Sequence, residues 1–209
     1  MTRRACPTWV FLVSLQFLFF SPGCSRHVTS FQVESFKHPV SQVYSEQFEN
    51  GVYALNSHHN WDLVFEVPAA WTPTTQPASS QSAAVADQNT WYSQLLHIKV
   101  FWTPEPGDTY AESTQTNAAI RYYLFMGTEI MTYEGAGFVY FHPPRQGEQF
   151  TGRIESASLH PAQKTSAAND LFGPCRLSGE FAANENLRQV RTKLQQARRN
   201  LVSKSAPAK

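Results

Sequence analysis

The sequence predicts an all-β domain, an antiparallel β-sandwich (or barrel) of about 7–8 strands, followed by one C-terminal amphipathic helix. Short segments in which apolar and polar residues alternate recur along the chain, as in strands with one buried face. Thirteen prolines and ten glycines punctuate these segments, as expected for many turns. Near the C-terminus the apolar spacing changes from two residues to three or four, which indicates a helix.

The clearest strands lie in the middle of the chain. In the segment 95–102 the residues Leu96, Ile98, Val100 and Trp102 share one face. The segment 119–126 is expected to point Ile120, Tyr122, Leu124 and Met126 inward. Further strands are expected within 31–36, 48–55, 61–67, 130–141, 149–159 and 177–181. The predicted β-domain therefore spans residues 48–183, with a long Ala-, Ser-, Thr-, Gln- and Pro-rich loop at 68–90.

The C-terminal helix is expected over residues 184–202. Its apolar residues are spaced three and four apart, which puts them on one stripe: Leu187, Val190, Leu194, Ala197 and Leu201. Asn184 or Asn186 is the expected N-terminal cap. The stripe either docks on the domain itself or pairs with another helix. Residues 203–209 are expected to be disordered.

Charge is unevenly distributed along the 209 residues. The net charge is only +1, and charged residues make up 16% of the chain. Residues 24–187 carry eight Lys or Arg and all sixteen Asp and Glu, whereas residues 188–209 carry seven Lys or Arg and no acid. An acidic body with a basic end predicts that the end contacts an anionic surface, another protein or its own domain. No wider basic platform exists, so nucleic-acid binding is not expected.

The N-terminal segment 1–23 has the composition of a secretory signal peptide. Arg3 and Arg4 precede an apolar run at 9–20, and small residues follow it. The apolar run is shorter than the roughly 20 residues of a membrane-spanning helix. We therefore expect export and removal of this segment. A twin-arginine signal is disfavoured because Cys6 and Pro7 stand where apolar residues are needed.

At Cys24 the segment resembles the lipobox of bacterial lipoprotein precursors. That pattern has an aliphatic residue, two small residues and an invariant cysteine. Gly23 and Cys24 match it, whereas Ser21 and Pro22 depart from it. The resemblance covers residues 1–24 only. It implies cleavage between Gly23 and Cys24, acylation of Cys24, and a membrane-anchored protein of the cell envelope (outer membrane or periplasm-facing), with residues 24–47 as the anchor segment leading into the domain.

A second interpretation uses the same residues. Ser21 and Gly23 also form a small-x-small site for the ordinary signal peptidase, which leaves Cys24 unmodified. The protein would then be secreted, and Cys24 would be able to form a disulfide with Cys175 in an oxidising compartment.

No catalytic, metal or cofactor motif is evident in the sequence. His58 and His59 are adjacent and have no third ligand at a useful spacing. Three acids that flank one loop would suit a hydrolase only if they met in a cleft: Glu105, Asp108 and Glu112. Seven aromatic residues crowd into adjacent strands, as core packing or as an exposed surface for sugars: Tyr122, Tyr123, Phe125, Tyr133, Phe138, Tyr140 and Phe141.

The leading functional hypothesis is an exported, lipid-anchored envelope protein of non-catalytic, structural or interaction type. Its partners are membrane lipid through acylated Cys24, and an envelope protein or anionic surface through the 184–202 helix. The alternatives are a carbohydrate- or ligand-binding β-module and a secreted hydrolase that uses the loop carboxylates.

Overall fold

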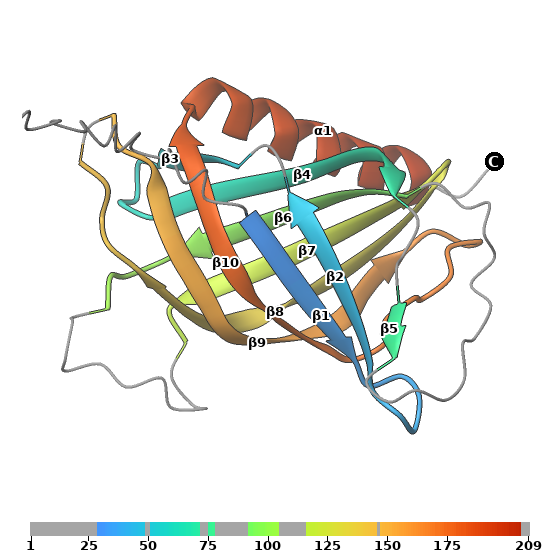
Figure 1. Ribbon diagram of the computed structural model, residues 1–209. Coiled ribbons are helices and arrows are strands. Elements are labelled where there is room, and N and C mark those ends of the chain that lie inside the picture. The colour runs from blue at the N-terminus through green and yellow to red at the C-terminus, as the bar shows by residue number, and fades with distance from the viewer. Residues whose placement is uncertain are drawn as a thin grey trace, which may run out of the picture.

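The computed structural model describes residues 29–48, 51–71, 75–77, 92–104, 116–145 and 147–205. These residues form ten strands in one sheet and a single helix, α1, at Leu187–Ser205 (Figure 1). The strands are β1 (Thr29–Ser35), β2 (Gln42–Phe48), β3 (Val52–Leu55), β4 (Trp61–Trp71), β5 (Thr75–Pro77), β6 (Tyr92–Val100), β7 (Ala118–Met126), β8 (Glu129–Phe141), β9 (Phe150–Lys164) and β10 (Cys175–Glu185). The predicted β-rich fold with a C-terminal helix is confirmed.

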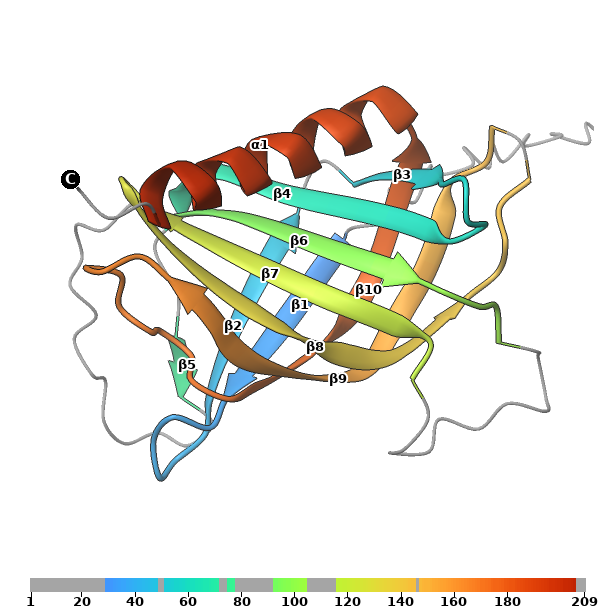
Figure 2. The same ribbon diagram turned by 180° about the vertical axis from the view of Figure 1, so that it is seen from behind.

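The sheet curls until its first strand, β3, meets β10, while β1, β2 and β5 extend the sheet beyond that contact. Neighbouring strands run in the order β3-β4-β6-β7-β8-β9-β10-β1-β2-β5 and are antiparallel. The end of β10 also pairs with β3 in parallel, with Asn184 opposite Val52 and Glu185 opposite Tyr53. The two facing layers expected from the sequence are thus opposite walls of one curved sheet, as the front and back views show (Figures 1 and 2).

The sheet begins earlier than the predicted boundary at residue 48. Strand β1, and all of β2 except its last residue, lie within the range 24–47 that was expected to lead into the domain. Alternate residues of β1 from Thr29 to Ser35 are buried, which makes it part of the core. The predicted loop at 68–90 is also shorter than expected, because β4 continues to Trp71 and β5 pairs with β2. The strand expected within 31–36 is β1, so β2 and β5 are the strands that raise the number from the expected 7–8 to ten.

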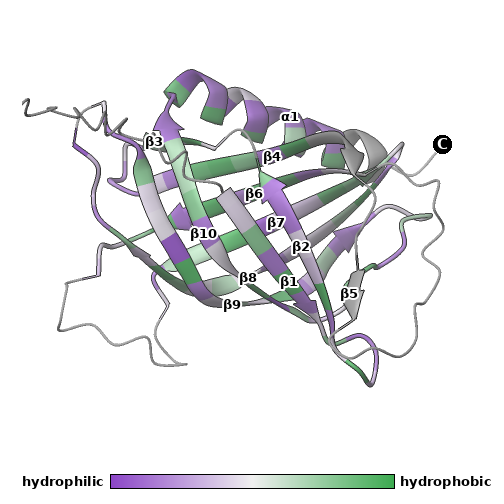
Figure 3. Cartoon of the chain, in the orientation of Figure 1, coloured by the Kyte–Doolittle hydropathy of each residue, from purple (hydrophilic) through white to green (hydrophobic). Residues whose placement is uncertain are grey.

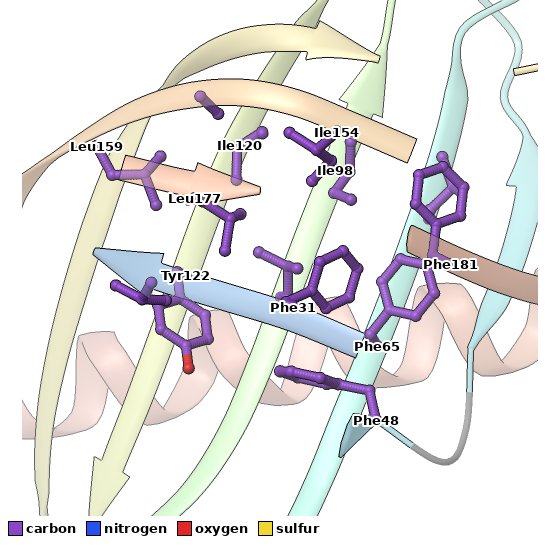
Figure 4. Close-up of a cluster of buried hydrophobic side chains, with 14 of the residues drawn as sticks. Phe31, Phe48, Phe65, Ile98, Ile120, Tyr122, Ile154, Leu159, Leu177 and Phe181 are labelled. Atoms are coloured by element: carbon purple, nitrogen blue, oxygen red, sulfur yellow. The ribbon is translucent and has the colours of Figure 1, made fainter. Parts of the chain in front are cut away.

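The concave side of the sheet encloses the main hydrophobic core. Of the residues predicted to point inward, six lie in this core, and Met126 packs against it: Leu96, Ile98, Val100, Ile120, Tyr122 and Leu124. Trp102 was also expected on the inward face, but β6 ends at Val100 and Trp102 is 42% exposed. Phe31 is central, because its ring centroid lies 5.2 Å from those of both Phe48 and Phe65. Figure 4 shows these rings beside aliphatic side chains from the other walls: Ile98, Ile120, Ile154, Leu159 and Leu177. Edge-on aromatic contacts of this kind hold the opposite walls together.

The helix docks on the convex side of the same sheet, over β3 and β4. Val190 and Ala197 are buried there, and Leu194 and Leu201 pack beside them. Their contacts come from outward residues of four strands: Val52, Ala54, Val64, Leu95 and Tyr123. The helix is otherwise largely hydrophilic (Figure 3). Of the two alternatives for the apolar stripe, docking on its own domain is the one observed.

The ends of α1 differ slightly from the predicted bounds of 184 and 202. The helix starts at Leu187 because Asn184 and Glu185 are still paired with β3. Asn186 is its cap, since its Oδ1 accepts a hydrogen bond of 3.0 Å from the backbone N–H of Gln189. The helix continues to Ser205, three residues into the predicted disordered tail. Pro207 is the first residue in the sequence that cannot continue a helix.

The start of β1, the end of β10 and the start of β3 meet where the sheet closes. A β-carbon on Gly51 would lie 2.4 Å from the carbonyl oxygen of Ala182, so only glycine allows β3 to approach β10 this closely. The hydroxyl of Thr29 donates to that same carbonyl at 3.1 Å and accepts from the Ala182 N–H at 3.0 Å. Thr29, the first residue of β1, is therefore hydrogen-bonded to the strand that leads into α1.

Replacing the Thr29 hydroxyl tests whether its hydrogen bonds to Ala182 stabilise the fold. Thr29→Val keeps the side-chain shape but leaves both backbone groups of Ala182 without their buried partner. We expect the free energy of unfolding, measured by urea titration, to fall by about 1–3 kcal/mol. Thr29→Ser restores the hydroxyl and should recover most of that loss. A Thr29→Val protein as stable as the wild type would contradict this role.

Candidate functional site

Several residues predicted to carry function lie outside the described part of the chain. These include Gly23 and Cys24 of the expected processing site, and the three loop acids Glu105, Asp108 and Glu112. Processing and acylation of Cys24, and catalysis by the loop acids, therefore stay predictions.

Cys175, the other partner in the alternative disulfide, is the first residue of β10. Its thiol is free and only 3% exposed. Burial raises the pKa of the Cys175 thiol to about 12, and the nearby negative charge of Asp170 adds to the effect. A buried thiol with so little thiolate reacts slowly with disulfides and alkylating reagents.

This burial predicts that Cys175 resists alkylation in the native protein. With iodoacetamide at about pH 8, Cys175 should be labelled at least roughly 100-fold more slowly in native protein than in denatured protein. The labelled site is identified by mass spectrometry of the peptides. Rapid labelling of the native protein would show that the thiol is accessible, contrary to the structure.

The two adjacent histidines lie on the surface in the turn between β3 and β4. Both His58 and His59 are exposed, and His59 has a positive φ of 58°. The side-chain oxygen of Asn56 shapes this turn by accepting from the backbone N–H groups of His58 and Asn60. Within the described ranges, no group of three His, Cys, Asp or Glu side chains is arranged to hold a metal ion.

Most of the crowded aromatic residues are core residues. Five of the seven are buried: Tyr122, Tyr123, Tyr133, Phe138 and Phe141. Phe125 and Tyr140 are half-buried. Tyr140 lies beneath the guanidinium of Arg153, 5.0 Å from the ring centroid, at a hollow of about 390 Å³ that Glu180 also lines. The aromatic residues thus serve mainly to fill the sheet rather than to form an exposed platform.

An Asp–His pair that the sequence analysis did not identify lies on the convex side of β4 and β6. Nε2 of His97 is 2.9 Å from Oδ1 of Asp62, and Nδ2 of Asn56 donates to the other oxygen at 2.8 Å. Burial alone would raise the pKa of Asp62, but these two hydrogen bonds and the nearby positive charges lower it overall. Such a pair orients an imidazole for proton transfer.

The surroundings of this pair show what it does in the structure. No serine, threonine or cysteine side chain in the described segments hydrogen-bonds to His97, so a nucleophile is not positioned beside it. Next to it, Nε of Arg121 lies 2.7 Å from Oε1 of Glu134, and this ion pair joins β7 to β8. One pair thus joins β4 to β6 and the other joins β7 to β8 on the convex side, and the sequence alone does not reveal them because their members belong to different strands.

Polar side chains also point into the mainly apolar interior, among them Gln94 and Glu46. Gln94 is fully buried and accepts a hydrogen bond from the hydroxyl of Tyr122, whereas its Nε2 has no partner among the described residues. Glu46 projects inward between Tyr44 and Phe48, and burial raises its pKa to about 7. The enclosed cavity beside Glu46 measures about 10 Å³, room for roughly one water molecule.

Glu46 should make the stability of the protein depend on pH. Its pKa rises from 4.5 to about 7 on folding, so the unfolded chain ionises first and stability falls as pH increases between these values. Glu46→Gln should therefore raise the free energy of unfolding by about 1 kcal/mol at pH 8 and by much less at pH 4. Chemical denaturation at both pH values measures the difference. Glu180→Gln, which removes one exposed acid from β10, is the matched control, and an equal gain for both variants would contradict the assignment.

The exposed side of α1 carries a concentration of positive charge. Arg188, Arg191, Arg198 and Arg199 are all exposed, and among the described residues none of them forms an ion pair. Lys193, on another side of the helix, pairs with Glu66 of β4. A polar groove of about 940 Å³ runs between the first half of the helix and the sheet. The convex side therefore offers the larger polar surfaces, while the interior is filled.

Comparison with protein-family models, curated proteins and solved structures finds no match for this chain. Among the described residues, no helix combines the length and the apolar character needed to cross a membrane. The site residues must therefore be interpreted from their own geometry and chemistry.

Proposed function

We propose that the protein is an exported, lipid-anchored component of the cell envelope that acts through surface contacts and not through catalysis. The observation that supports the anchor is the segment 1–24, in which a signal peptide ends at a cysteine in a lipobox-like setting. Acylation of Cys24 on its sulfur and amine would give stable attachment, because two or more chains bind far more strongly than one.

The position of the first strand supports a domain held close to the membrane. Strand β1 begins at Thr29, five residues after Cys24. Five residues span at most about 18 Å even when fully extended. An acylated Cys24 would thus keep the sheet within reach of the bilayer surface rather than on a long tether.

Side chains fill the interior of the sheet almost completely, which supports a function carried out by the outer surface of the protein. The cavity beside Glu46 has room for about one water molecule, whereas the groove along α1 measures about 940 Å³. A protein of this shape meets larger partners with its outer surface. We therefore place its contacts on the convex side, at and around α1.

Metabolic labelling tests the anchor. Cells that express the full chain are fed an alkyne-tagged palmitate, and the protein is isolated and examined for the tag. The wild-type protein should carry the lipid and remain in the membrane fraction, and Cys24→Ser should lose at least about nine-tenths of the label, because Cys24 is the proposed acylation site. Cys6→Ser and Cys175→Ser are matched controls and should be labelled like the wild type.

Two results would contradict the proposal. One is a wild-type protein that takes up no lipid. The other is a disulfide between Cys24 and Cys175, found by mass spectrometry of non-reduced peptides, because a bonded Cys24 sulfur cannot also carry a lipid.

A further inference from the structure

We propose that four arginines of α1 lie against the anionic phospholipid headgroups of the membrane that holds Cys24. These residues, Arg188, Arg191, Arg198 and Arg199, are called the arginine face. The inference names the surface that the domain contacts, and its biological setting rests on the proposed lipid anchor.

The arginine face is a continuous surface of the helix. At 3.6 residues per turn, its four residues fall within an arc of about 100° around the helix axis. All four are exposed, and the buried residues Val190 and Ala197 lie on the side toward the sheet. Docking therefore fixes the direction in which the arginines point.

The charge of this face is not neutralised within the domain. Among the described residues, Lys193 is the one residue of α1 with an acidic partner, Glu66, and it lies outside the arginine face. The helix from Leu187 to Ser205 contains no acid at all. Arginine binds phosphate groups through two parallel N–H donors, so a surface of phospholipid headgroups complements this face in charge and geometry.

Apolar side chains accompany the arginines. Leu187 is 43% exposed and Val202 is 71% exposed, one at each end of the face. On the helix they are oriented closer to the arginines than to the opposite polar flank. Basic residues interspersed with exposed apolar ones are typical of helices that lie in the interfacial region of a bilayer. An acidic protein surface would not favour the exposed Val202 in the same way.

The first described residue after the proposed anchor, Thr29, lies close to the strand that leads into α1. Thr29, which follows Cys24 by five residues, is hydrogen-bonded to Ala182, and α1 begins five residues after Ala182. Figure 1 shows β10 running into the start of α1, with β1 beside it. Anchoring through Cys24 would hold the helix near the bilayer, so that weak headgroup contacts become effectively intramolecular.

Vesicle binding of the unacylated mature chain tests the face independently of the anchor. Residues 24–209 with Cys24→Ser, which include the whole sheet and α1, are sedimented with vesicles of phosphatidylcholine alone or with about 30% phosphatidylglycerol. We expect binding only to the phosphatidylglycerol vesicles, and its loss above about 0.5 M salt, where charges are screened. Equal binding to the two kinds of vesicle would overturn the inference.

Charge-matched variants locate the binding surface. Changing all four residues of the arginine face to Gln should lower the partition coefficient by roughly 100-fold, because each arginine contributes separately to headgroup binding. Changing four exposed cations elsewhere to Gln removes the same charge and should have a much smaller effect: Lys37, Arg145, Lys164 and Arg176. Equal losses would mean that net charge and not the arginine face is responsible. Thermal unfolding of both variants verifies that the fold is retained.

A crosslinker in cells distinguishes lipid from protein. Gln195 lies among the arginines and is exposed, so a photoreactive residue placed there should crosslink to phospholipid in the wild-type background. Crosslinking mainly to a protein would overturn the inference in favour of a protein partner. If palmitate labelling fails while vesicle binding is retained, the anchor is refuted and the arginine face is not. If palmitate labelling succeeds while vesicle binding fails, the arginine face is refuted and the anchor is not.

Discussion

Closure of the sheet between β10 and β3 is the constraint on which the rest of the structure depends. The contact is short, with Asn184 and Glu185 opposite Val52 and Tyr53, and it requires the missing side chain of Gly51. Closure turns one face of each strand into a wall of a shared interior, so Phe31 of β1 can meet Phe65 of β4. It also sets the direction of the chain after β10, and therefore the place where α1 docks. The same contact brings β3, on which α1 docks, beside the strand that leads into the helix.

Much of the β-fold follows from local sequence patterns. Leu96, Ile98 and Val100 point inward as the alternation predicts, and so do Ile120 and Leu124. These strands are recognisable because each has one apolar and one polar face. Strand β2 is not recognisable from the sequence, because its inward positions include Glu46, which breaks the apolar pattern. Strand β5 has only three residues and one proline, and only its pairing with β2 identifies it.

The polar groups of the structure were much harder to predict. Asp62 and His97 are 35 positions apart and meet only because the register of β4 and β6 brings them together. Asn117, which directly precedes β7, is fully buried. Its side chain exchanges hydrogen bonds with the backbone of Val139, 22 positions away in β8. Single-sequence patterns report periodicity along one strand and contain no signal for such cross-strand partners. The basic composition of the C-terminal segment was visible in the sequence, whereas the direction in which its arginines point depends on docking.

Within the described residues, the positive charge of α1 forms few contacts with the domain. All sixteen acids of the chain precede the helix in the sequence, between Glu34 and Glu185. Among the described residues only Glu66 forms an ion pair with the helix, through Lys193. Packing uses Val190 and Ala197, which are small enough to let the helix lie close to β3 and β4. An exposed cluster of like charges gains little stability for its own domain and repels itself. The four arginines form no ion pair with any described residue, so their charge remains available for the proposed contact with lipid headgroups, and Thr29, the first described residue, lies beside the strand that leads into α1.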